Sequence, residues 1–173
     1  DYPRDGKKWV PYAKGGPFKK WFGNLWWVIN WKDNGTALKK SPKAATSNIS
    51  YYFKQGLNYS RVTTAPINAR FTPENHICDD ASPFIWSKKK DDFFLLGIIN
   101  SSLSSFLLNL LNPTVNFQTT DIKDIPLKKK ASSYSKKIKV FSKTNTVLKK
   151  HLTTFSLIER NFTHTPLDWA RNE

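Results

Sequence analysis

The sequence of 173 residues contains no methionine and a single cysteine, Cys78. One thiol cannot form an intrachain disulfide, so we expect a reducing, cytoplasmic setting. The first residues carry no apolar run, and we expect no signal peptide. Because even position 1 is not methionine, we expect a processed or excised piece of a longer protein. If selenium-labelled methionines are instead missing from the sequence, the spacings below shift slightly.

Acidic residues are scarce, since 13 Asp and Glu stand against 28 Lys and Arg, which gives a formal net charge of +15. Such an excess predicts a polyanionic partner, with nucleic acid ahead of an acidic membrane surface. Aromatic residues make up 14% of the chain and hydrophobic residues 39%. That is enough apolar material for a core, which excludes wholesale disorder and suits one domain with an extension.

Catalytic and metal-binding signatures are also missing. No P-loop and no GxGxxG motif occurs, and His76-x-Cys78 supplies only two of the four ligands that a zinc site needs. We interpret Asp79-Asp80 as a turn and Asp91-Asp92 as a helix cap. Asn112-Pro113-Thr114 lacks the second proline and the aromatic residue of a catalytic NPP-type motif. The sequence therefore predicts no catalytic residue, no metal site and no cofactor in this segment.

The uncharged stretch from Phe93 to Thr120 marks the part that the fold is expected to bury. Apolar residues recur every three or four positions from Asp91 to Leu111, which predicts a helix that Asn112-Pro113 ends. A helix of about 20 residues could span a bilayer. Its serines and asparagines would then face lipid, so we expect a core helix. The expected apolar stripe is Leu95, Ile99, Leu103, Phe106 and Leu110.

Short strands separated by turns are expected on either side of a polar loop at 39–50. The first three form an antiparallel meander with turns at 14–17 and 23–24, and a further turn follows at 33–35. The pattern predicts a curled, mostly antiparallel sheet, or partial barrel. The expected strands are 9–12, 18–22, 25–31, 51–54, 57–64, 69–72, 76–78 and 84–86.

Two more helices are expected after the central one. Residues 119–122 predict a capped helical turn, which Pro126 ends. Residues 133–155 predict a longer helix, and the tail at 156–173 would need a partner domain on which to pack. The apolar stripe of the longer helix is expected to be Ile138, Phe141, Val147 or Leu148, Leu152 and Phe155.

Basic and aromatic residues alternate through the first ninety positions, as in Lys8-Trp9 and Lys19–Phe22. Lysine and arginine neutralise phosphates and supply most non-specific affinity for nucleic acid. Asn58, Asn68 and Arg70 could pair with base edges, for about 1–3 kcal/mol of discrimination each. Alternatively, the tryptophans are core residues and the lysines only keep the chain in solution. The candidate DNA-binding residues are Lys7, Lys8, Lys14, Lys19, Lys20, Trp21, Asn58, Tyr59, Arg61, Asn68, Arg70, Lys88, Lys89 and Gln118.

Three blocks of the sequence occur in an order that resembles the C-terminal target-recognition region of adenine-specific DNA methyltransferases. They are WVPYAKGGPFKKWFGNLWWVINWKDNG at 9–35, YYFKQGLNYSRV at 51–62 and FLLGIINSSLSSFLLNLLNPTVNFQTTDIKDIPL at 94–127. The closest likeness is to the large PglX-like enzymes of phage-exclusion systems and to fused restriction-modification enzymes. IERNFTHTPL at 158–167 resembles a degraded SWDF-x-x-HPL segment of that family, without its opening Ser-Trp.

The resemblance implies a division of labour within a parent enzyme. A methyltransferase domain of the same parent chain would hold S-adenosylmethionine and the catalytic NPP-type motif. Residues 1–127 would recognise a double-stranded DNA target, and 128–173 would form a helical extension. Gly16, Phe18 and Asp121 would have architectural roles. The positions that match family motifs are Lys14, Gly16, Phe18, Trp21, Asn116, Gln118 and Asp121.

We therefore expect an α+β domain in which a curled sheet reads DNA and the helix at 91–111 covers its apolar face. Stacking aromatics and lysines serve single strands equally well, so a general RNA-binding module without an enzymatic partner is the rival interpretation. A third interpretation is a protein-interaction or membrane-surface domain built on the uncharged helix.

Overall fold

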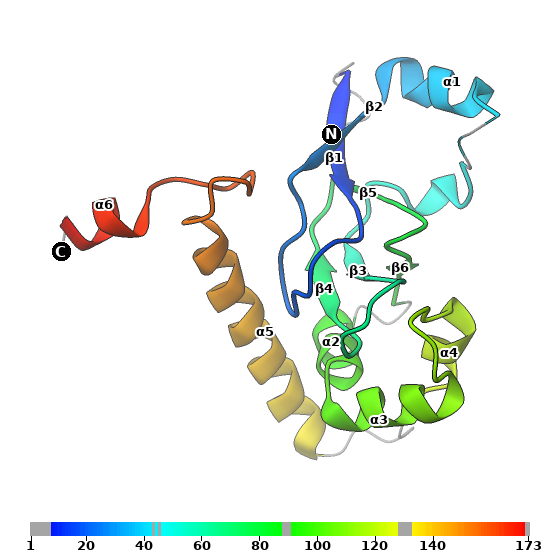
Figure 1. Cartoon of the computed structure of the whole chain (residues 1–173), viewed down its shortest axis with the longest axis vertical. Helices are drawn as coiled ribbons and strands as arrows, with labels where there is room; N and C mark the ends of the chain where they lie inside the picture. Colours follow the sequence, from blue (N-terminus) through cyan, green and yellow to red (C-terminus); the bar gives the residue numbers. More distant parts are fainter. Residues whose placement is uncertain (1–7, 43, 45, 88–90, 128–132, 172–173) are drawn as a thin grey trace.

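The computed structural model describes residues 8–42, 44, 46–87, 91–127 and 133–171. Within these ranges the chain forms two small sheets, six α-helices and one 3-10 helix (Figure 1). The α+β class is confirmed. The strands do not close into a barrel in the described part of the chain, so the expected partial barrel is replaced by two separate three-stranded sheets.

The first sheet has the strand order β2-β1-β5. Strand β1 (Trp9–Ala13) pairs antiparallel with β2 (Trp27–Asn30) and parallel with β5 (Ile77–Cys78). The expected strand at 18–22 is wrong, because this segment is a loop in which Trp21 has a φ of 77°. The Trp21 backbone exchanges hydrogen bonds with Ala69 and Phe71 at 2.9 Å each, so the loop ties the first sheet to the second.

The second sheet has the order β4-β3-β6, and its pairings are antiparallel. It consists of β3 (Gly56–Tyr59), β4 (Ala69–Thr72) and β6 (Phe84–Ile85). A Cβ at Gly56 would lie 2.3 Å from the Phe84 ring, so only glycine allows these strands to approach so closely. Strand β3 ends at Tyr59, so the strand expected at 57–64 is shorter than predicted.

Two segments before β3 differ from the sequence-based expectation. Helix α1 (Lys32–Lys40) was not predicted, and it begins with left-handed backbone at Asp33, Asn34 and Gly35, where a turn was expected. The expected strand at 51–54 is wrong, because the chain forms the 3-10 helix η1 (Ile49–Tyr51) and then turns at Phe53, whose φ is 64°.

The expected central helix is divided into α2 (Asp92–Ile99) and α3 (Ser102–Leu111), which are bent by 65° relative to each other. Asn100 causes the break, since its side chain bonds both the N–H and the carbonyl of Ala69 on β4, at 2.8 and 2.9 Å. Ser101 then caps α3 by accepting from the Ser104 N–H. No single helix in the described ranges is long and apolar enough to cross a bilayer; the bent pair meets that test together, by length and composition alone.

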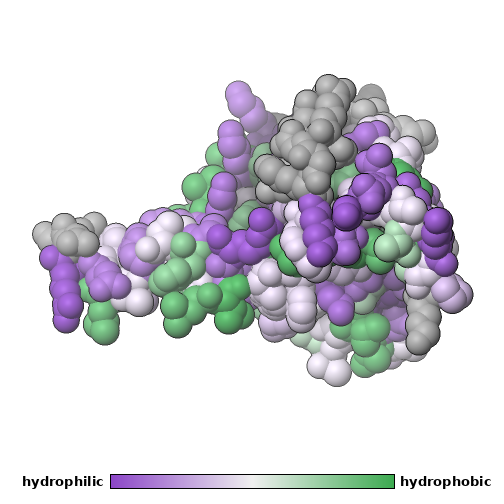
Figure 2. Space-filling model, turned by 90° about the horizontal axis from the view of Figure 1, so that it is seen from above, coloured by the Kyte–Doolittle hydropathy of each residue, from purple (hydrophilic) through white to green (hydrophobic). Residues whose placement is uncertain are grey.

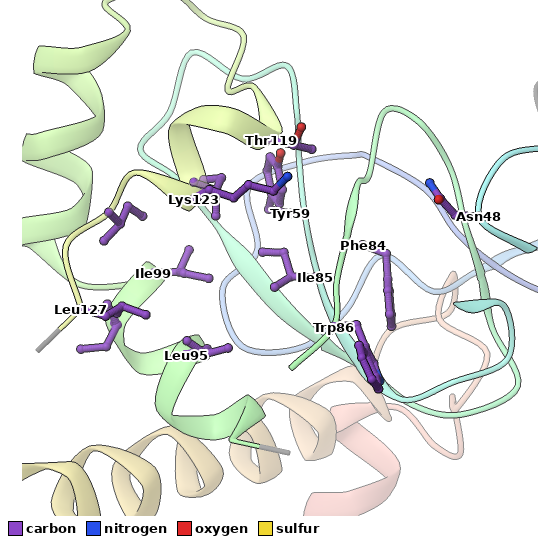
Figure 3. A pocket seen from close by; sticks show the side chains of 13 residues that line it. Asn48, Tyr59, Phe84, Ile85, Trp86, Leu95, Ile99, Thr119, Lys123 and Leu127 are labelled. Carbon is purple, nitrogen blue, oxygen red and sulfur yellow. The ribbon is translucent and has the colours of Figure 1, made fainter. Parts of the chain in front are cut away.

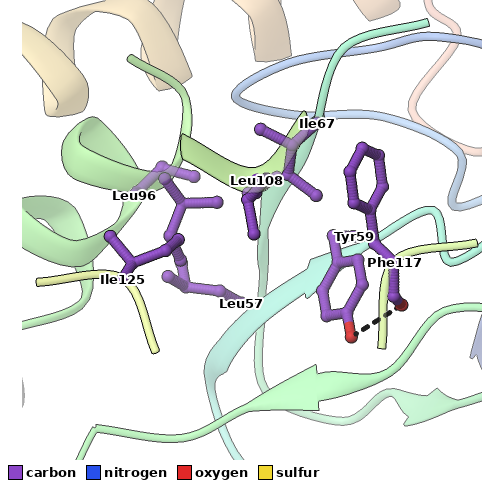
Figure 4. Close-up of a cluster of buried hydrophobic side chains, with 9 residues drawn as sticks. Leu57, Tyr59, Ile67, Leu96, Leu108, Phe117 and Ile125 are labelled. Carbon is purple, nitrogen blue, oxygen red and sulfur yellow. Dashed lines mark hydrogen bonds between the residues drawn. The ribbon is translucent and has the colours of Figure 1, made fainter. Parts of the chain in front are cut away.

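The main core lies between the second sheet and these helices (Figure 4). Leu57, Tyr59 and Ile67 meet Leu96 and Leu108 there, and all five side chains are fully buried. The expected stripe of the central helix holds only for its first half. Ile99 is buried and Leu95 half-buried, whereas the later members are exposed, by 64% at Leu103, 60% at Phe106 and 66% at Leu110.

The remaining helices are α4 (Thr119–Lys123), α5 (Ser133–Thr153) and α6 (Pro166–Arg171), and the first two confirm the predicted helices. Helix α5 packs beside α2, and the following chain projects from the body as an arm that carries α6 (Figure 1). The face of α5 that meets the body contains Ser142 and Thr146, which are buried. The stripe expected to face the core is mostly exposed.

Candidate nucleic-acid interface

Two of the predicted phosphate-binding lysines lie over tryptophan rings on the first sheet. Lys8 Nζ is 5.2 Å from the centroid of Trp9, and Lys14 Nζ is 5.4 Å from that of Trp27. Trp9 and Trp27 are about half exposed. Hydrophilic side chains gather over the end of the molecule that β1, β2 and α1 form (Figure 2). A cation held on a ring stays at the surface, where it can also meet a phosphate.

Lys19, Lys20 and Trp21, three other candidate DNA-binding residues, make contacts within the protein. Lys19 Nζ lies 2.7 Å from the Glu159 carboxylate, whose side chain is 1% exposed. Lys20 Nζ donates to the Asn100 carbonyl at 2.8 Å, and burial lowers the pKa of Lys20. Trp21 is half-buried between the two sheets. These three residues attach the loop at 14–26 to the body. The ammonium groups of Lys19 and Lys20 are bonded to Glu159 and to the Asn100 carbonyl.

The predicted base-reading residues are inside the protein. Asn58, Asn68 and Arg70 are fully buried, so they cannot touch a duplex in this conformation. Asn58 donates to Ser82 Oγ at 2.6 Å, and Arg70 Nη1 donates to Asn68 Oδ1 at 2.7 Å. Burial lowers the pKa of Arg70 to about 10. We correct their predicted role to that of a buried polar network.

Tyr59, another candidate, is also fully buried. Its hydroxyl reaches the Phe117 carbonyl at 3.5 Å, and burial raises its pKa to about 12 (Figure 4). It is a core residue. Lys7, Lys88 and Lys89 lie outside the described residues.

Arg61 and Gln118 are brought together from segments 57 positions apart. Arg61 Nη2 donates to Gln118 Oε1 at 3.1 Å, and its Nη1 lies 2.6 Å from Asp80 Oδ2. The Arg61 carbonyl also accepts from the Phe117 N–H at 2.8 Å. Gln118 directly precedes α4, so its side chain is fixed where a loop meets a helix. This geometry leaves a partly exposed guanidinium beside an amide, the groups that pair with base edges.

Arg61 and Gln118 line a cleft of about 900 Å³ whose other side is aromatic. The rings of Tyr51 and Trp86 lie 5.4 Å apart, nearly edge to face. Lys54 Nζ lies over both of them, at 5.3 and 5.6 Å. Sequence reasoning missed this group because it interpreted 51–54 as a strand. The signal available was the lysine that ends the run Tyr51-Tyr52-Phe53.

A smaller apolar cavity of about 470 Å³ adjoins the cleft and shares Phe84, Trp86 and Lys123 with it (Figure 3). Its far wall comes from α2 and from the segment around α4, through Leu95, Ile99 and other aliphatic side chains. The combined groove is therefore polar and aromatic at one end, where its lining holds Arg61 and Lys123 and also Asp79 and Asp80, and aliphatic at the other.

Two of the titratable groups that line the cleft have shifted pKa values. Burial lowers the pKa of His76 and raises that of Cys78 to about 12, so the thiol stays protonated at neutral pH. In the part of the chain that the structure describes, no cluster of three His, Cys, Asp or Glu side chains could hold a metal ion. What the arrangement offers is cations on aromatic rings and amide groups at a surface.

No protein-family model matches the chain. Over 134 residues it is 33% identical to the adenine-specific methyltransferase PglX of Lacticaseibacillus casei (strain Zhang), a match that covers 73% of this chain. Over 127 residues it is 32% identical to the adenine-specific methyltransferase BrxX of Escherichia coli O9:H4 (strain HS), which covers 72%. The chain spans only about a tenth of the length of these relatives. Over most of its length it is therefore similar to one segment of the adenine-specific methyltransferases.

Proposed function

We propose that this chain is the DNA target-recognition segment of an adenine-specific DNA methyltransferase in a restriction-modification or phage-defence system. The observation that carries the proposal is the similarity of about three quarters of the chain to a tenth of PglX and BrxX. A domain elsewhere in the parent would hold S-adenosylmethionine and catalyse the transfer. This segment would bind the duplex and select the site.

The net charge of +15 and the surface groups support this role. Lys8 and Lys14, on the rings of Trp9 and Trp27, would contact phosphates. Arg61 and Gln118, which line the cleft and share a hydrogen bond, would contact base edges. Phosphate contacts fix the position of a protein on a duplex, and base contacts specify the sequence.

The phosphate contacts are tested by the salt dependence of duplex binding. Replacing Lys8 and Lys14 together by alanine should lower the slope of log K against log salt by about 2, because each phosphate contact contributes about 0.9. The matched control is the double replacement of Lys143 and Lys150, which removes the same charge from α5. Equal changes in the two double variants would show a general charge effect and reject the interface.

The base contacts are tested by selection from a random duplex library with Gln118→Ala and Arg61→Ala. We expect each variant to lose preference at one or two base pairs, at about 1–3 kcal/mol for the pair concerned. Uniform weakening across all sequences would assign these residues to the backbone contacts instead.

The second candidate function is single-stranded RNA binding, which the Tyr51–Trp86 pair with Lys54 above it supports. Base stacking on an aromatic ring contributes about 1–3 kcal/mol and tolerates any sequence. A competition between duplex DNA and single-stranded RNA separates the two functions. Tighter RNA binding that Trp86→Ala abolishes would favour the RNA function.

A further inference from the structure

Helix α5 carries an apolar stripe with heptad spacing. Its members follow one another at intervals of four and three residues, the spacing of the a and d positions of a coiled coil. Tyr134, Phe141 and Leu148 share the d position and are 67%, 64% and 56% exposed. The full series, in which Asn145 is the one polar member and Phe155 lies two residues beyond the end of α5, is Tyr134, Ile138, Phe141, Asn145, Leu148, Leu152 and Phe155.

The body covers the neighbouring face of α5 and also reaches Ile138 of the stripe. Ser142 and Thr146 are buried against it, and a Cβ at Gly97 of α2 would lie 2.5 Å from Ser142 Oγ and from Ile138 Cγ2. Small side chains on both helices allow this close approach. The d positions then line the edge of the contact, where the ring of Phe141 meets the edge of Trp21, with centroids 6.1 Å apart. An exposed apolar stripe of this length marks an interaction surface.

The charges on α5 specify what can cover the stripe. The helix holds six lysines and no acidic residue between Ser133 and Thr153. Lys137 and Lys149 flank the stripe at the g and e positions, which set partner choice in coiled coils. A second copy of α5 would bring six more lysines and no carboxylate to the contact. Asn145, at an a position, suits a coiled coil in which it fixes the register, and it would be costly in the acyl region of a membrane.

We propose that α5 pairs with an acidic amphipathic helix of another domain of the parent methyltransferase. That helix would place apolar residues against Phe141 and Leu148 and carboxylates against Lys137 and Lys149. At the C-terminal end of α5 the Phe155 ring already meets Trp169 of α6 at 6.2 Å, so the arm closes that end of the stripe. The inference rests on the proposed function only in placing the chain within a larger enzyme.

The test uses the 173-residue chain and a labelled 21-residue helical peptide with leucine at the a and d positions, one a-position asparagine, and glutamate at e and g. Anisotropy should show binding at least tenfold tighter than to the same peptide with lysine at e and g. Phe141→Ala with Leu148→Ala should abolish that preference. The matched control, Leu103→Ala with Leu110→Ala, removes similar exposed apolar area from α3 and should leave it intact.

Several outcomes would overturn the inference. Equal binding of the two peptides would show unspecific apolar contact. Concentration-dependent dimerisation lost in the α5 double variant would assign the stripe to a second copy. Binding to vesicles of anionic lipid, lost in the same variant while the peptides bind equally, would assign it to a membrane surface. DNA binding is measured separately on each variant. A chain that fails to bind DNA can therefore still test the helix pairing, and a chain that fails to bind the peptide can still test DNA recognition.

Discussion

The core around α2 and the outer face of α5 make opposite use of the same kind of sequence. In the core, Leu57, Leu96 and Leu108 are fully buried. On α5, Phe141 and Leu148 recur with similar regularity but are more than half exposed. Apolar spacing thus identifies a face of a helix, and it does not identify what covers that face. In this chain the core residues cover one another, whereas most of the stripe on α5 remains exposed, as the proposed pairing requires.

The largest contrast between the two regions should appear in paired alanine substitutions. Leu96→Ala should lower the free energy of unfolding by about 2–5 kcal/mol, because it leaves a cavity beside Leu57 and Leu108. Leu148→Ala removes the same atoms from an exposed position and should change it by less than about 0.5 kcal/mol. Urea unfolding followed by circular dichroism measures both variants. A large loss from Leu148→Ala would mean that the stripe is packed in the chain itself.

The next effect concerns the ion pair that joins the arm to the body. Lys19→Met should cost about 3 kcal/mol, because it leaves the Glu159 carboxylate, 1% exposed, without its cation. Glu159→Gln should cost only about 1 kcal/mol, since Lys19 is 26% exposed and can turn to solvent. Urea unfolding measures the asymmetry. The double variant is the control and should be more stable than Lys19→Met. An equal loss of unfolding free energy in the two single variants would contradict the different burial of the two partners as its cause.

Sequence reasoning predicted the α+β class, the long C-terminal helix and several strands, and it failed where distant partners decide the outcome. Asn100 breaks the central helix because Ala69, 31 positions earlier, offers it both backbone groups. Lys19 forms an ion pair with Glu159, 140 positions later. Arg70 has the residue type of a base reader, yet β3 and β4 bury it. Local pattern contains none of these pairings, whereas Lys8 lies over the ring of Trp9, the next residue in the sequence.

A smaller effect tests how α5 is held against α2. Gly97→Ala places a Cβ within 2.5 Å of Ile138 and Ser142. Overpacking of this kind costs about 1–3 kcal/mol, and the better helix propensity of alanine offsets up to about 1 kcal/mol, so a net loss of about 1–2 kcal/mol is expected. Trypsin should then cleave at the lysines of α5 before it cleaves the body.

The double variant Gly97→Ala with Ser142→Gly is the check on that mechanism. It removes one of the two clashing side chains, so it should recover part of the protection from trypsin. Faster cleavage in the body than in α5 would mean that Gly97 acts through the core instead.

The smallest effect is on the pH dependence of stability, which should differ between a variant of a buried tyrosine in the core and a variant of an exposed tyrosine on α5. Burial raises the pKa of Tyr59 from 10.0 to about 12. Because the folded value lies above the unfolded one, its contribution to stability is complete below pH 10 and is lost as the pH rises toward 12. Tyr59→Phe should therefore flatten the fall of the urea midpoint between pH 9.5 and about 11. Tyr134→Phe, 67% exposed on α5, is the matched control and should leave the fall unchanged; an equal effect of both would show that burial is not its cause.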